Sequence, residues 1–72
     1  MQVSEIMKKS TGQPGAITIN QDESIDNAAT IMKENNLQSI KVVNDEDKVV
    51  GIITRKSIID SAGDLNEDFF LD

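Results

Sequence analysis

The chain has 72 residues, and its 7 Lys and Arg residues against 13 Asp and Glu residues give a net charge of −6 at neutral pH. It has no Cys and no His, which excludes disulfides, thiolate metal sites and the usual near-neutral proton carrier. The acidic balance argues against nucleic acid and anionic membrane as partners, and the longest apolar runs are far below the roughly 20 residues that span a membrane. We therefore expect one small cytoplasmic domain, since the N-terminus is also too polar for a secretory signal.

The first 20 residues predict a helical turn, a loop and a short strand. Ser4 can cap a turn over residues 4–9. The STGQPG sequence of residues 10–15 is typical of a loop, because Pro and Gly interrupt regular structure. The apolar residues 16–19 that follow favour a strand.

The next segment predicts an amphipathic helix. Asp22 or Ser24 can cap its start, where acidic side chains also suit the positive end of the helix dipole. Asn35 and Asn36 can take the left-handed conformation that ends a helix. The apolar residues between these ends follow i, i+3, i+4, i+7 spacing and form one stripe, namely Ile25, Ala28, Ala29 and Met32.

Residues 39–43 and 49–54 are the strongest strand signals, and the polar residues 44–48 between them predict a hairpin. The acidic side chains of this hairpin offer too few ligands for Ca²⁺, so we predict no metal site there. Thr54 can cap a second helix that runs to about Ala62.

The order of elements is therefore β-α-β-β-α after an N-terminal helical turn. This order predicts an α+β fold, a small three-stranded sheet with two helices on one face. We assign residues 1–62 to this domain and residues 63–72 to an acidic C-terminal tail. Phe69 and Phe70 of the tail are expected to cover an apolar surface of a dimer, and the alternative is a short motif that docks on a partner protein.

Four segments give the chain a resemblance to a known family: VSEIM, AITI, AATIMKENNLQSIKVVND and VVGIITRKSIID. In this order, over residues 3–60, the chain resembles a single CBS domain, the regulatory module named after cystathionine β-synthase. Members usually occur as tandem pairs, or Bateman modules, whose clefts bind adenosine-containing ligands such as AMP, ADP, ATP or S-adenosylmethionine. The resemblance implies sensing and not catalysis, and no readable motif in this chain activates a nucleophile, so we predict no enzyme.

The resemblance also implies a ligand site at the junction of the last strand and the second helix, which in nucleotide-binding members is similar to G-h-h-T-x-x-D. Thr54 matches the Thr that contacts phosphate, and Arg55 and Lys56 add positive charge beside it. Ser57 stands where the family has an Asp that accepts hydrogen bonds from ribose, and its single hydroxyl is a weaker acceptor. In the alternative interpretation Thr54 is only a helix cap and the two basic residues are solvated.

The rest of a family-like pocket would come from the first two predicted strands. Lys41 stands where many members have Pro; it can reach a phosphate, or it is a solvated residue that guards a strand edge. Ile17 and Ile40 can flank an adenine ring, although core packing is the ordinary role of both. The candidate residues in these strands are Ala16, Ile17, Thr18, Ser39, Ile40 and Lys41.

A sheet with both helices on one face leaves its other face in need of cover. Burial of apolar area stabilises a fold by about 25 cal/mol per Å², and ordering the chain costs about 1.5 kcal/mol per residue. In a domain of this size the two contributions nearly cancel. We therefore expect a homodimer, with Val3, Ile6 and Met7 at its contact together with the strands. Two hypotheses stay open: a dimeric sensor of an adenosine nucleotide or S-adenosylmethionine, and a ligand-free interaction module in which Ser57 marks a lost site.

Overall fold

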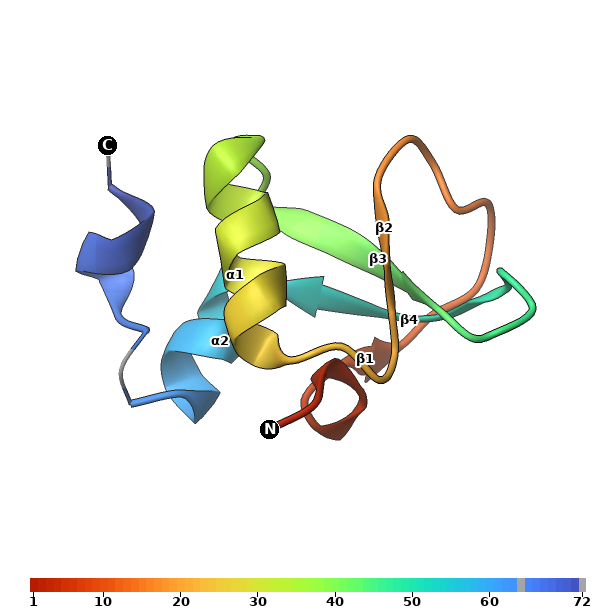
Figure 1. Ribbon diagram of the computed structural model, residues 1–72, viewed down its shortest axis with the longest axis horizontal. Helices are drawn as coiled ribbons and strands as arrows, with labels where there is room; N and C mark the ends of the chain where they lie inside the picture. The colour runs from red at the N-terminus through yellow and green to blue at the C-terminus, as the bar shows by residue number, and fades with distance from the viewer. Residues whose placement is uncertain (64, 72) are drawn as a thin grey trace.

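A computed structural model describes residues 1–63 and 65–71 of the chain (Figure 1). Within these residues, four strands form one mixed sheet in the order β1-β4-β3-β2. In chain order the elements are η1 (Val3–Glu5), β1 (Lys8–Lys9), β2 (Thr18–Asn20), α1 (Ile25–Glu34), β3 (Ser39–Val43), β4 (Val49–Thr54), α2 (Arg55–Ser61) and η2 (Glu67–Phe70). The predicted α+β class is confirmed, with a larger sheet than expected.

The fourth strand comes from the N-terminal segment. Residues 4–9 do not form one helical turn, because the 3₁₀ helix η1 is short and β1 follows it and pairs antiparallel with β4. Gly51 of β4 explains this pairing: a Cβ there would collide with the Sδ of Met7 and would lie 2.9 Å from the carbonyl oxygen of Lys8. A strand glycine thus lets another backbone approach closely.

Hydrogen bonds at the helix ends show which of the predicted caps are used. Ser24 caps α1, since its Oγ accepts a backbone N–H of the first turn at 3.1 Å. The N-terminal helical turn, η1, begins after Gln2 and not at Ser4, because the backbone N–H of Gln2 donates to a carboxylate oxygen of Glu5 at 2.6 Å. Asn36 has a φ of 54°, the left-handed conformation predicted for the end of α1.

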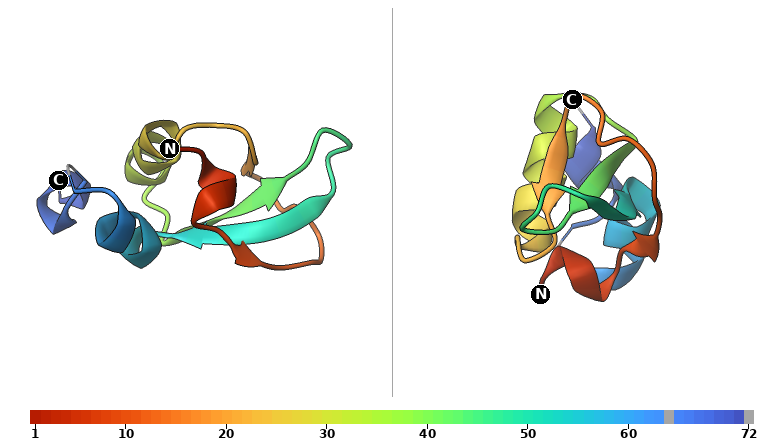
Figure 2. Two further views of the ribbon diagram at one scale, coloured as in Figure 1. Left: turned by 90° about the horizontal axis from the view of Figure 1, so that it is seen from below. Right: turned by 90° about the vertical axis from the view of Figure 1, so that its right-hand side faces the viewer.

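The hydrophobic core lies between α1 and one face of the sheet, and the left view of Figure 2 shows α1 on that side of β3 and β4. β2 pairs parallel with β3, which pairs antiparallel with β4. Ile40 stands opposite Ile53 in this register, and both are buried in the same cluster as all four residues of the predicted α1 stripe. Ile58 of α2 joins this cluster, so both helices contribute to one core.

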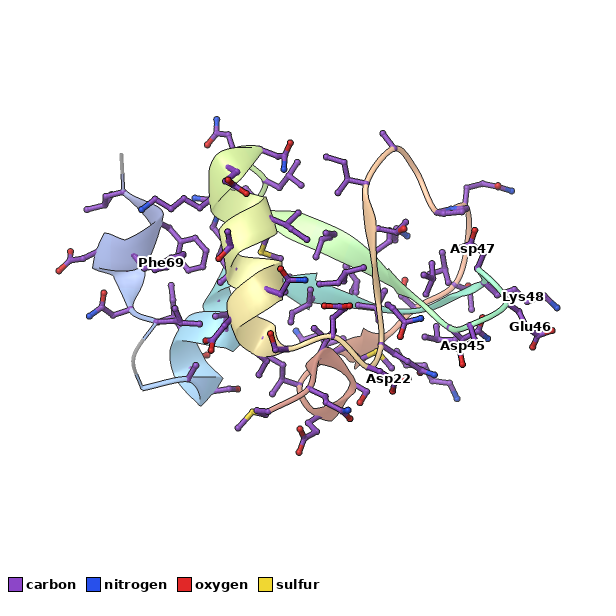
Figure 3. The ribbon with its side chains drawn as sticks, viewed as in Figure 1. Asp22, Asp45, Glu46, Asp47, Lys48 and Phe69 are labelled. Carbon is purple, nitrogen blue, oxygen red and sulfur yellow. The ribbon has the colours of Figure 1, made fainter. Side chains whose placement is uncertain are left out.

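The connection between β3 and β4 is an exposed hairpin, as predicted. Its turn is held by Asn44, whose Oδ1 accepts the backbone N–H of Glu46 at 2.9 Å and that of Lys48 at 3.1 Å. Figure 3 shows Asp45, Glu46 and Asp47 spread around the tip of the hairpin. The polar sequence of residues 44–48 is therefore accounted for by the turn itself.

The C-terminal segment packs on its own chain, and η2 lies beside α1 at the end of the molecule away from the hairpin (Figure 1). Phe70 is 8% exposed and Leu65 6% exposed, and both belong to the core. The prediction that Phe69 and Phe70 cover a dimer surface is therefore wrong for Phe70, which this chain already covers. Val3, expected at the same dimer contact, is likewise fully buried in the core. Asp64 and Asp72 of the predicted acidic tail lie outside the described residues.

Two basic side chains hold the pair of rings in the tail. The Nζ of Lys33 lies 4.9 Å from the ring centroid of Phe69, and the guanidinium carbon of Arg55 lies 5.1 Å from that of Phe70. The two rings meet edge to face, with their centroids 5.1 Å apart. Such cation–π contacts add attraction beyond simple burial. Because Lys33 belongs to α1 and Arg55 to α2, the tail contacts both helices.

Candidate functional site

A groove of about 270 Å³ opens where the loop before β2 meets β3 and β4. Five of the predicted ligand residues line it together: Ala16, Ile17, Ser39, Ile40 and Lys41. The complete lining is Pro14, Gly15, Ala16, Ile17, Leu37, Ser39, Ile40, Lys41 and Ile52. Residues that are far apart in the sequence thus meet at one concave surface with mainly apolar walls.

Part of this groove belongs to the face of the sheet opposite the core, which we call the open face. Side chains alternate between the two faces along a strand, so Lys41 and Ile52 point away from the buried Ile40 and Ile53. Lys41 and Ile52 are also direct cross-strand partners, and such partners share one face of a sheet.

The loop over residues 10–17 forms one wall of the groove. β2 begins at Thr18, two positions later than the predicted strand, so Ala16 and Ile17 belong to this loop. Thr18 itself is paired with Lys41 in β3 and does not line the groove. The loop therefore places an apolar side chain, that of Ile17, in the wall of the groove, where it also packs against the hydrophobic core.

The path of this loop depends on two glycines, and a lysine of β3 contacts it. Gly12 has a φ of 112° and Gly15 a φ of 79°, a region that L side chains rarely adopt. The Nζ of Lys41 donates a hydrogen bond to the carbonyl oxygen of Thr11 at 3.4 Å. Lys41 thereby ties the loop to β3 along the rim of the groove.

Thr54 caps α2, as predicted, and lies next to the groove without lining it. Its Oγ1 accepts the backbone N–H of Ser57 at 3.2 Å and donates to the Oγ of Ser57 at 3.1 Å. Thr54 is the cross-strand partner of Ser39, which does line the groove. The hydroxyl groups of Thr54 and Ser57 are therefore hydrogen-bonded to one another within the cap of α2.

The structure does not bring Arg55 and Lys56 into this groove. Both line a second, larger hollow of about 540 Å³, which is completed by Gln38, Ile59, Asp60, Glu67, Phe70 and Leu71. The Nε of Arg55 donates to the carbonyl oxygen of Leu37, and its guanidinium faces Phe70. The predicted ligand cluster at residues 54–57 does not form one site. Arg55 and Lys56 line the second hollow, where the guanidinium of Arg55 contacts Phe70 of the tail.

Sequence reasoning missed Ile52 as a groove residue and Lys8 beside it. Lys8 of β1 is the cross-strand partner of Ile52, so its side chain belongs to the open face as well. The two-residue period of a strand places Ile52 and Ile53 on opposite faces, so one of the two had to lie away from the core. Nothing local predicts Lys8, because its position depends on the pairing of β1 with β4.

Across residues 1–63 and 65–71, no group of three or more His, Cys, Asp and Glu side chains is arranged to hold a metal ion. No helix in the same part of the chain has the length and apolar character that crossing a membrane requires.

Comparison with known proteins identifies relatives of this chain. A family model described as CBS domain matches residues 3–64. The uncharacterized protein MJ1232 of Methanocaldococcus jannaschii is 42% identical over 57 residues, which cover 79% of this chain and 18% of that protein. This chain therefore spans less than a fifth of that curated relative.

Solved structures show the same fold. The CBS domain pair of protein MJ0100, in complex with 5′-methylthioadenosine and S-adenosylmethionine, superimposes with a TM-score of 0.62 at 36% identity, covering 69% of this chain and 40% of that one. The cytosolic domain of the Mg²⁺ channel MgtE, in complex with ATP, gives a TM-score of 0.61 at 25% identity, covering 67% of this chain and 19% of that one. In both cases the match is to a part of a larger protein.

Proposed function

Because this chain belongs to the CBS domain family, we propose that it is a regulatory module that binds an adenosine-containing ligand in the groove beside the open face. CBS domains are regulatory modules rather than catalytic ones, and the resemblance predicted from the sequence is confirmed. The proposal includes a cytoplasmic location and no catalytic activity.

The observation that carries the proposal is the composition of the groove. Ile17 and Ile52 supply apolar surfaces on which a purine ring can lie, and Ser39 supplies a hydroxyl for a polar contact. The solved relatives support the class of ligand, because MJ0100 is in complex with two adenosine derivatives and MgtE with ATP. The proposed ligands are AMP, ADP, ATP or S-adenosylmethionine.

We also propose that two copies of the chain form a homodimer through their open faces. The groove has a volume of about 270 Å³, whereas pockets that enclose a small molecule usually measure about 300–1,000 Å³. A second copy would supply the missing wall. The solved MJ0100 structure is a pair of CBS domains, and this chain has the length of one such domain.

A second candidate function is a ligand-free module for protein interaction or assembly. Ser57 and Thr54 favour it, because the hydroxyl of Thr54 is engaged in the cap and a Ser stands where a ribose-binding Asp is expected. In this case the partner would be a protein of another chain, and the groove would stay empty.

Calorimetric titration with AMP, ADP, ATP and S-adenosylmethionine, with light scattering on the same sample, tests the proposal. We expect one of them to bind with a Kd below about 100 μM, which corresponds to about −5.5 kcal/mol. Ser39→Trp fills the groove and should abolish this binding, whereas Lys48→Trp at the exposed hairpin is the matched control and should leave it unchanged. Light scattering should show the mass of a dimer.

The alternative function predicts a different pattern. No ligand would bind the wild-type chain up to about 1 mM, a limit of about −4 kcal/mol, and Ser57→Asp would restore binding. A monomer in light scattering would contradict the homodimer regardless of the ligand result.

A further inference from the structure

One row of side chains crosses the open face from edge to edge. In the register of the sheet, Lys8 of β1 pairs with Ile52 of β4, Ile52 pairs with Lys41 of β3, and Lys41 pairs with Thr18 of β2. Neighbouring strands are about 4.8 Å apart, so the two lysines stand about 10 Å from each other with Ile52 between them. Both side chains are long enough to reach a group at the edge of a purine ring that lies on Ile52.

Both charged residues of this row, Lys8 and Lys41, are positive. Lys41 is the single ionisable residue among the nine that line the groove, and Lys8 adds a second positive charge beside Ile52. Acidic side chains labelled in Figure 3 belong to the hairpin tip and to the turn before α1, and none of them lines the groove. The groove is therefore a cationic site on an acidic chain of net charge −6.

This local charge favours some adenosine derivatives over others. The monophosphate group of AMP carries about −1.5 to −2 charges at neutral pH. 5′-Methylthioadenosine has a neutral methylthio group in its place, and S-adenosylmethionine has a cationic sulfonium there. The overall negative charge of the chain opposes an anion only weakly, because at about 0.15 M salt charges more than about 8 Å apart are largely screened.

Resting on the proposed function, we propose that the groove selects adenosine ligands that carry a 5′-phosphate, and that Lys41 and Lys8 determine this specificity. The hydrogen bond of Lys41 to the carbonyl of Thr11 is long, at 3.4 Å. A phosphate oxygen would form a shorter, charge-assisted bond with the same Nζ. On binding, Lys41 would then release the carbonyl oxygen of Thr11 and bond the phosphate of the ligand instead.

Calorimetric titration of the full chain with AMP and with 5′-methylthioadenosine tests the inference. AMP should bind at least tenfold more tightly, and this preference should shrink as salt is added. Lys41→Gln should lower the affinity for AMP about tenfold and Lys8→Gln about fivefold, since Lys8 is the more exposed of the two. Neither substitution should change the affinity for 5′-methylthioadenosine more than about twofold, because it lacks the charged group.

Lys9→Gln is the matched control. Lys9 follows Lys8 in β1 and pairs with Gly51, so its side chain leaves the strand on the opposite face. It removes the same charge from the chain and should leave both affinities unchanged. Circular dichroism melting of the three variants confirms that each is folded.

The outcomes separate this inference from the function on which it rests. If both compounds bind with equal affinity, or 5′-methylthioadenosine or S-adenosylmethionine binds more tightly than AMP, the charge selection is refuted and the adenosine site stands. The inference also fails if Lys41→Gln weakens both compounds alike, because the lysine then acts on the groove and not on the phosphate. If neither compound binds at about 1 mM, the proposed function fails and the inference fails with it.

Discussion

Replacing Phe70 with alanine tests whether the C-terminal segment is part of the folded domain. Phe70 is 8% exposed and belongs to the same buried cluster as the α1 stripe. Removing a buried Phe side chain costs about 3–5 kcal/mol, and loss of its cation–π contact with Arg55 adds about 0.5–1 kcal/mol. Phe70 is at the end of the chain, where the backbone can relax, so we expect about 3 kcal/mol for Phe70→Ala.

This loss is large for a chain of 72 residues. At roughly 0.05–0.15 kcal/mol per residue, its total stability is about 4–11 kcal/mol. A loss of about 3 kcal/mol should lower the melting temperature by about 15 °C, since each kcal/mol corresponds to about 4–8 °C in a domain of this size. Urea unfolding followed by circular dichroism at two protein concentrations measures the effect and detects any contribution from association.

Two neighbouring residues provide internal controls for Phe70→Ala. Phe69→Ala should cost about 1 kcal/mol, because the ring of Phe69 is only partly buried and faces the amine of Lys33. Leu71→Ala should change the stability by less than about 0.5 kcal/mol, because Leu71 is 65% exposed. The reasoning is refuted if Phe70→Ala unfolds like the wild-type chain, or if it dissociates a dimer without changing the stability of the monomer.

Substitutions at three further positions, Gly51, Ser24 and Asn36, test the fold locally. Gly51→Ala should destabilise the chain by about 2 kcal/mol, because its Cβ collides with Met7, and urea unfolding of Gly51→Ala with and without Met7→Ala should show partial rescue. Ser24→Ala should cost about 1 kcal/mol in the same assay, because α1 loses its N-cap hydrogen bond, whereas Ser24→Asp should keep it. Asn36→Ala should cost about 1 kcal/mol and Asn36→Gly nearly nothing, because φ is 54° there; equal melting temperatures for these two variants would contradict the left-handed geometry.

The sequence by itself determined the features that depend on near neighbours along the chain. The stripe of α1 and its end at Asn36 follow from helical spacing and from the backbone freedom of Asn. The β3–β4 hairpin and the cap at Thr54 follow from polar residues whose side chains bond backbone groups within four residues. The ordered motifs over residues 3–60 were enough to indicate the family.

Only the tertiary structure decided which distant residues share a surface. Lys8 joins the open face because Gly51 admits β1 to the edge of β4, and no local pattern in the N-terminal segment indicates that pairing. Arg55 leaves the predicted ligand cluster because Phe70, 15 positions later, provides a surface for its guanidinium. The physical reason is common to both: contacts between distant segments depend on burial and on which side of an element each side chain leaves, and these are defined only once the elements pack together.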